Sequence, residues 1–424
     1  MSWAMSPWTG RGRVLLAATA VAVAAFTVSL AAGRTGAAAR AAGPTQHQAA
    51  SRAWVGGWST APVLGSGAGF ADRTLRQIVH VGLGGDAIRV RVTNAFGADG
   101  VRLDHVRVGL RQAGAAVIAG TERPVTFGGL TRLTLAAGAQ VLSDPVALAV
   151  QAGQDLAISM YVPGSVAAPT RHGGAFATSY FAAGDHSGEA AADAFTSTTT
   201  SWFLLDGVDV RTTARAGAVV ALGDSITEGT CSTVDANHRY PDDLARRIFG
   251  ARPGRPLSVL NLGTSGNRLV SDAGTNGISA QGRFERDVLA QRGARDVILL
   301  EGINDIGHNI GPVISDPVTP EDLVAAMSNI VRAAHAAGLR VIGGTLLPIA
   351  GSKYDNPEAE AKRQAVNEWI RHGGAFDAVV DFDAALRDPA DPARYLPGYD
   401  CGDHLHPNDA GYQAMADAID LRTL

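Results

Sequence analysis

The sequence predicts two architectures in succession: an all-β sandwich or jelly roll over residues 54–210, then a three-layer α/β domain over residues 216–424. Two observations support this division. Before residue 210, short apolar runs alternate with polar residues at a period of two, and Gly or Pro separates the runs. After residue 216, apolar runs alternate with helical stretches, which is typical of a parallel sheet covered on both faces.

The first region alternates clearly at Ile88, Val90 and Val92, which are separated by polar side chains. Similar runs occupy residues 106–110, 133–135, 146–150 and 156–160. We therefore expect an antiparallel sandwich without helices of ordinary length. Its aromatic residues are interpreted as core filling rather than as a carbohydrate platform.

The second region contains five predicted strands, at 217–222, 257–261, 296–300, 340–345 and 378–381. Predicted helices lie at 240–249, 281–290, 320–337, 357–371 and 409–421. The third helix is well marked, because Thr319 is a suitable N-cap and Pro320 occupies the first helical position. Five strands alternating with helices fit a doubly wound, flavodoxin-like sheet.

The N-terminal segment has the pattern of a secretory signal. Arg11 and Arg13 precede an uncharged apolar stretch over residues 14–32, and Ala39-Arg40-Ala41 offers a cleavage site. We predict a signal peptide over 1–41, a flexible leader over 42–53 and an extracellular mature protein without a membrane anchor. An uncleaved anchor is the alternative, because a stretch of that length can just span a bilayer.

The composition restricts the possible functions. The chain has 424 residues, is 46% hydrophobic and carries a formal charge of −4, as expected for a globular protein. It has no basic run, so nucleic acid is not an expected partner. Nothing in the sequence specifies an oligomeric state.

The predicted strand ends of the second region carry polar residues that suit acyl transfer. Such a reaction requires a nucleophile, a base and a group that orients the base. Ser225, directly after the first strand, is the candidate nucleophile, with His406 as base and Asp403 to orient it. The N–H groups of Ser225 and Gly263 and the amide of Asn304 are the candidate oxyanion hole. These residues should meet because the carboxyl ends of parallel strands share one rim.

Three neighbouring residues are assigned supporting roles. Asp224 is expected to fix the turn before Ser225. Asp305 is expected to support Asn304, and His404 to point away from the site.

Over about residues 216–424 the chain resembles the SGNH (GDSL-type) hydrolases, whose four blocks are matched in order by Ser225, Gly263, Asn304 and the Asp403/His406 pair. The first region resembles the β-rich N-terminal part of some secreted members. The resemblance implies a serine esterase that uses no metal or cofactor. Its expected substrates are short-chain or sugar O-acyl esters, either small molecules or polysaccharides.

Three alternatives remain open. One is a lipase or phospholipase that acts on longer acyl chains, and another is a polysaccharide-binding protein with a vestigial hydrolase domain. The third is a metal cluster formed by Cys401, Asp403, His404 and His406, but its spacing fits no usual zinc pattern.

The two cysteines are predicted to form a disulfide. Cys231 follows Ser225 closely, and Cys401 shortly precedes Asp403. A triad would bring both loops to the same rim, and export would expose the thiols to an oxidising compartment.

Overall fold

The computed structural model describes residues 51–65, 69–251, 254–308 and 317–424. The predicted signal peptide (1–41), its cleavage site and the leader up to residue 50 lie outside the described residues. Within the described part of the chain, no helix is both long and apolar enough to cross a membrane.

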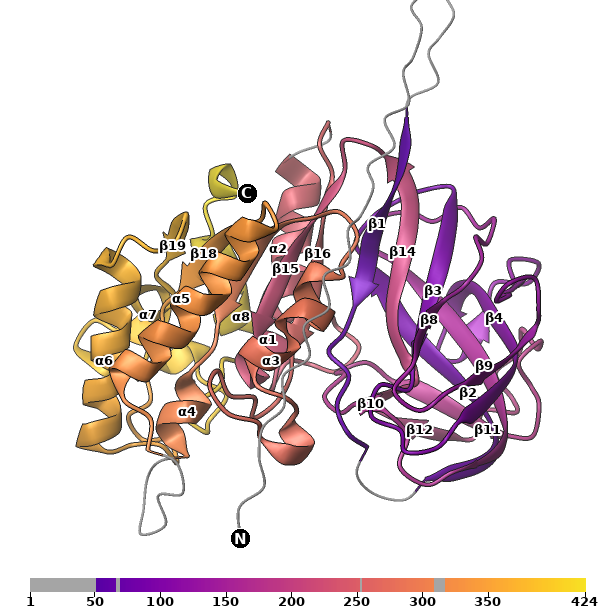
Figure 1. The fold of residues 1–424 in the computed structure, drawn as a ribbon, viewed down its shortest axis with the longest axis horizontal. Helices are drawn as coiled ribbons and strands as arrows, with labels where there is room; N and C mark the ends of the chain where they lie inside the picture. The colour runs from indigo at the N-terminus through magenta and orange to yellow at the C-terminus, as the bar shows by residue number, and fades with distance from the viewer. Residues whose placement is uncertain (1–50, 66–68, 252–253, 309–316) are drawn as a thin grey trace, which may run out of the picture. The chain divides into compact units, whose positions relative to one another are not determined.

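The first region is all-β, as predicted, and consists mainly of two antiparallel sheets (Figure 1). One sheet has the order β1-β14-β3-β8, with bounds Arg52–Ser59, Leu205–Thr213, Ala87–Thr93 and Gln140–Leu142. The other has the order β12-β11-β2-β9-β4-β5, with bounds Ser197–Thr199, Ser179–Ala183, Phe70–Val81, Gln154–Val166, Val101–Ala113 and Ala116–Val117. The short strands β6 (Arg123–Pro124) and β7 (Arg132–Leu135) pair with β4. A further pair is formed by β10 (Arg171–His172) and β13 (Trp202–Phe203).

Two details of the first region differ from the sequence pattern. The predicted strand at 146–150 forms only isolated bridges, Ile88↔Val146 and Gly85↔Val150, and Pro145 immediately before it has no N–H to donate to a ladder. Strand β1 starts at Arg52, inside the predicted leader, because Arg52 pairs with Thr213.

The second region contains a parallel sheet of order β16-β15-β17-β18-β19, which confirms the predicted α/β fold (Figure 1). The bounds in this order are Leu257–Gly263, Gly217–Gly223, Ala294–Leu300, Arg340–Gly344 and Ala378–Val380. Helices α2 (Tyr240–Ala251) and α8 (Asp409–Ala418) pack together. Helices α3 (Ala280–Phe284), α5 (Pro320–Ala336) and α6 (Pro357–His372) pack in series.

Local signals explain several helix ends. Thr319 and Asp322 form a reciprocal capping box at the start of α5, as its sequence indicated. The predicted helix at 281–290 is instead α3 followed by a π-helical turn, η2 (Glu285–Leu289). Short elements without a periodic signature were not predicted: α4 (Ile303–Gly307), α7 (Phe382–Leu386), the hairpin β20–β21 (Arg387–Asp388, Asp391–Tyr395) and the turns η1 (Gly274–Asn276), η3 (Pro397–Tyr399) and η4 (Leu421–Thr423).

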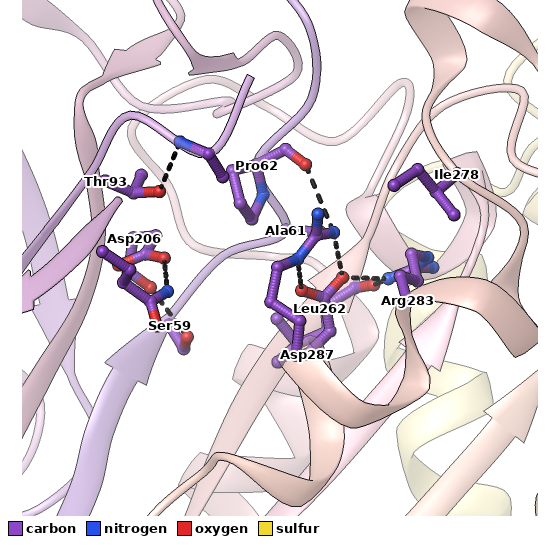
Figure 2. Close-up of polar contacts among 12 residues, drawn as sticks. Ser59, Ala61, Pro62, Thr93, Asp206, Leu262, Ile278, Arg283 and Asp287 are labelled. Carbon is purple, nitrogen blue, oxygen red and sulfur yellow. Dashed lines mark hydrogen bonds and ion pairs between the residues drawn. The ribbon is translucent and has the colours of Figure 1, made fainter. Parts of the chain in front are cut away.

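The two regions share one hydrophobic core cluster, and β1 lies along β16. The Gly56 N–H donates to Arg292 O at 2.9 Å, and Ser258 Oγ donates to Gly56 O at 2.5 Å. A Cβ at Gly56 would lie 2.8 Å from Leu260 Cδ1, so any larger residue there would require the Leu260 side chain to shift. Figure 2 shows part of the same junction, around Pro62 and Asp287. Arg286 donates to Pro62 O at 3.5 Å.

Candidate active site

Ser225 is presented by a sharp turn from strand to helix. β15 ends at Gly223, and the short helix α1 (Ser225–Glu228) follows at once. The Asp224 carboxylate caps this helix by accepting from the Ile226 N–H at 2.9 Å. Asp224 therefore fixes the turn, as predicted.

Ser225, His406 and Asp403 form a continuous hydrogen-bonded chain. Ser225 Oγ lies 2.8 Å from His406 Nε2, and His406 Nδ1 lies 2.6 Å from Asp403 Oδ2. The second oxygen, Asp403 Oδ1, accepts from the N–H groups of Leu405 and His406, both at 2.9 Å. One short loop thus holds both the ring and the carboxylate that orients it.

The charge of Asp403 follows from these contacts. Partial burial opposes ionisation, but hydrogen bonds from the His406 ring and from the two N–H groups hold its pKa below the usual value. When Nδ1 of His406 carries the ring proton and donates a hydrogen bond to Asp403, the lone pair of Nε2 faces the hydroxyl of Ser225.

His404 points elsewhere, as expected. Its Nδ1 contacts Asp400 Oδ2 at 2.5 Å, and its side chain is 49% exposed.

The Cys231–Cys401 disulfide is present, with 6.2 Å between the two Cα atoms, so that prediction is confirmed. It joins the loop after α1 to the loop that carries the base. Both sulfurs lie near Asp403, but a disulfide sulfur is not the thiolate that binds metal.

Asn304 lies on α4 with its amide fixed from both ends. Its Nδ2 donates to Asn267 O at 3.0 Å and is 3.4 Å from Asp224 Oδ2. Its Oδ1 accepts from the Tyr354 hydroxyl at 2.9 Å. The amide nitrogen is therefore held beside the turn that carries the nucleophile.

Gly263 has a different environment from the one expected. Its N–H donates to Asn261 Oδ1 at 3.0 Å, and Asn261 Nδ2 donates to Thr227 O at 2.8 Å. A Cβ at Gly263 would lie 2.1 Å from the backbone nitrogen of Glu228. The glycine makes room for α1 rather than for substrate, which argues against it as an oxyanion donor.

The backbone N–H groups of Ser225 and of Gly266, in the loop after β16, have no hydrogen-bond partner among the described residues. Gly266 has a φ of 70°, which favours glycine, and it immediately precedes Asn267, the acceptor for Asn304.

Two residues support the position of Asn304. Asp305 accepts from the N–H groups of Leu269 and Val270 at 2.7 and 2.9 Å, and thus holds the loop in which Asn267 O accepts from the Asn304 amide. Tyr354 was missed, because its loop carries no recognisable motif and its contact with Asn304 arises only in the fold.

Several acidic residues at and near α1 are buried. Burial raises the pKa of Asp224 and of Glu228 to about 7 and that of Asp305 to about 6. The buried cation nearby is Arg283, which donates to Gly223 O at 2.8 Å, to Leu262 O at 2.7 Å and to Asp287 at 3.0 Å. Figure 2 shows Arg283 beside Leu262 and Asp287.

Comparison with solved structures finds several hydrolases that resemble about half of the chain. An acetylxylan esterase, Axe2 from Geobacillus stearothermophilus, is 22% identical, with 49% of this chain and 93% of that chain covered and a TM-score of 0.38. A GDSL-like lipase from Bacteroides thetaiotaomicron is 21% identical, with 49% and 87% covered and a TM-score of 0.35. LAE5, an alpha/beta hydrolase enzyme from the metagenome of Lake Arreo, is 24% identical, with 48% and 92% covered and a TM-score of 0.36.

No curated protein sequence matches the chain. The family model of the GDSL-like Lipase/Acylhydrolase family matches residues 221–414, a span that includes the serine turn, Asn304 and the Asp403/His406 loop. Over that span, which is a little less than half of its length, the chain is similar to the GDSL-like lipase/acylhydrolase family.

Proposed function

We propose that this protein is a secreted serine esterase that hydrolyses carboxylic esters, with short acyl groups or O-acylated sugars as its substrates. The observation that carries the proposal is the chain Ser225 Oγ–His406 Nε2 (2.8 Å) and His406 Nδ1–Asp403 Oδ2 (2.6 Å). Residues 54–210 are proposed as an accessory β domain and residues 216–424 as the catalytic domain.

The geometry supports a two-step acyl transfer. Ser225 Oγ attacks the ester carbonyl carbon while His406 Nε2 takes the hydroxyl proton. His406 returns that proton to the departing alcohol oxygen, which leaves an acyl-serine. Water then attacks the acyl-serine with His406 as base again, which releases the acid and regenerates Ser225. These steps use only the chain's own residues and water.

The oxyanion of each tetrahedral intermediate requires donors. We propose the Ser225 N–H and Asn304 Nδ2, as in the sequence analysis; one amide hydrogen of Asn304 donates to Asn267 O, and the other has only the long 3.4 Å bond to Asp224 Oδ2 to exchange for the oxyanion. For the third donor we propose the Gly266 N–H in place of Gly263, because the Gly263 N–H is bonded to Asn261.

Secretion is supported by the signal-like N-terminus and by the Cys231–Cys401 disulfide. The preferred length of the acyl chain distinguishes the proposed esterase from the lipase alternative. A series of p-nitrophenyl esters should show falling activity beyond short acyl chains. Activity that instead rises with chain length would favour a lipase.

The test of the nucleophile is Ser225→Ala. We expect it to abolish both ester turnover, by on the order of 10⁴-fold or more, and labelling by a fluorophosphonate probe. The matched control is Ser232→Ala, which removes a buried hydroxyl from the following loop that bonds to no described residue. Retained labelling in Ser225→Ala would show that another residue is the nucleophile.

A further inference from the structure

The all-β region contacts the nucleophile helix through one buried histidine. His172, on β10, places Nε2 3.2 Å from Glu228 Oε1, and Glu228 is the last residue of α1. The two side chains are 4% and 2% exposed. His172 therefore belongs to one region and its carboxyl partner to the other, one helical turn from Ser225.

The ring of His172 is held on several sides. Its Nδ1 lies 2.9 Å from Ala61 O, and its plane stacks on Trp202 with centroids 5.5 Å apart. Trp202 is itself fixed, since its Nε1 donates to Ile78 O at 2.9 Å and Trp58 packs edge-on at 4.8 Å. The histidine is thus a rigid extension of the β region rather than a mobile side chain.

The Glu228 carboxyl is equally constrained. Its Oε2 accepts from the Ser265 hydroxyl, and the Gly174 N–H also bonds to the carboxyl. A Cβ at Gly174 would lie 2.6 Å from Glu228 Cδ, so the β-region loop approaches as closely as glycine permits. The Glu228 N–H donates to Asp224 O at 2.8 Å. A shift of the Glu228 side chain would therefore be transmitted along α1 toward Ser225.

Burial favours the uncharged forms of both partners. It lowers the pKa of His172 to about 4 and raises that of Glu228 to about 7. His172 Nδ1 faces Ala61 O at 2.9 Å, and Nε2 faces both Gly174 O and Glu228 Oε1 at 3.2 Å. Both ring nitrogens thus have partners, as a buried network requires.

We propose that His172 is a positioning residue for catalysis, through which the all-β region holds α1, and with it Ser225, in line with His406. The inference rests on the proposed function of Ser225 as nucleophile. By this proposal, the β region contributes to catalysis by positioning Ser225 and is more than an appended accessory domain.

The test measures the rate of Ser225 labelling by a fluorophosphonate, together with kcat and KM on a p-nitrophenyl ester, below the Tm of every variant. His172→Ala should lower the labelling rate and kcat by about 10-fold to 100-fold, with KM changed less than about 3-fold. His172→Gln, which retains a polar group toward Glu228, should recover most of the loss.

A double-mutant cycle then isolates the pair. Glu228→Ala should also lower the labelling rate, and adding His172→Ala to it should cause no further loss. The matched control is Leu103→Ala, which makes a cavity in the β-region core at a fully buried residue of β4. It should lower Tm without lowering the labelling rate.

Two failures are distinguishable. If wild-type protein is not labelled at Ser225, the proposed function fails. If wild-type protein is labelled and folded His172→Ala reacts at the wild-type rate, or reacts no more slowly than Leu103→Ala at an equal loss of Tm, the positioning role is overturned.

Discussion

Two histidine–carboxyl pairs in different regions of this molecule reach opposite electrostatic states. In the rim loop, Asp403 is 47% exposed and lies 2.6 Å from His406. At the junction with the β region, Glu228 and His172 are almost fully buried and lie 3.2 Å apart. The pKa of Asp403 is held below its usual value, whereas burial raises that of Glu228 to about 7.

The difference shows that solvent access decides what such a pair does. The His406 ring and two backbone N–H groups stabilise the Asp403 carboxylate at the partly exposed rim, so it keeps its charge. Glu228 also accepts hydrogen bonds, from Ser265 and Gly174, but its burial outweighs them and favours the protonated acid. Histidine and a carboxyl group thus form the proposed catalytic pair in one place and the proposed structural link in the other.

The largest expected effect comes from breaking the rim pair. Asp403→Asn should lower kcat by roughly 10³–10⁴-fold, because an amide nitrogen facing Nδ1 favours the wrong ring tautomer. Steady-state kinetics on a p-nitrophenyl ester measures this. The control is Asp400→Asn, which alters the neighbouring Asp400–His404 pair and should change kcat only a few-fold. Equal losses in the two variants would refute the assignment of Asp403.

Substitution of Asn304, which lies between the rim and the buried interior, is expected to have an intermediate effect on kcat. Asn304→Ala should lower kcat by roughly 10²–10³-fold with a smaller change in KM, because its donor acts in the transition state. Tyr354→Phe removes the hydrogen bond to Asn304 Oδ1, together with a longer one of 3.5 Å to His308 Nδ1, and should lower kcat about 5-fold. A change confined to KM in Asn304→Ala would make Asn304 a substrate-binding residue instead.

The smallest effect on rate, and a clear effect on stability, is expected from Glu228→Gln. Glutamine imitates the protonated acid, so kcat should stay near the wild-type value. The folded-state pKa of Glu228 is raised from 4.5 to about 7, so its stabilising contribution is complete below pH 4.5 and is lost as pH rises to 7.

The contribution of His172 to stability depends on pH in the opposite sense, because its folded-state pKa is lowered from 6.5 to about 4. That contribution is present above pH 6.5 and is lost as pH falls through 4, in both wild type and variant. The free energy of unfolding of Glu228→Gln relative to wild type should therefore rise between pH 4.5 and 7, by on the order of 1–3 kcal/mol. Urea unfolding at several pH values measures it, and a constant difference across that range would mean that Glu228 is ionised in the folded protein.

Much of the fold could be predicted from the spacing of apolar residues along the sequence. Apolar runs such as 217–222 and 296–300 predicted the parallel strands because a strand buried on both faces must be apolar throughout. The polar residues after those strands predicted one shared rim. There the structure joins Ser225 to the Asp403/His406 loop, and the Cys231–Cys401 disulfide forms between its loops, as predicted.

Other features depend on contacts between segments far apart in the chain, which no local pattern encodes. The sequence favoured Gly263 as a donor because it follows a strand, but only the packing of α1 reveals that its N–H is bonded to Asn261. Tyr354 supports Asn304 from a loop without any motif. His172 is one of several scattered histidines in the sequence, and its contact with Glu228 exists only because two separately patterned regions fold against each other. The sequence by itself determined the parallel strands and the rim where their polar ends meet, since these follow from local periodicity and chain order. The tertiary structure alone decided which donors are free and which buried groups keep a charge, because both depend on what surrounds a side chain in space.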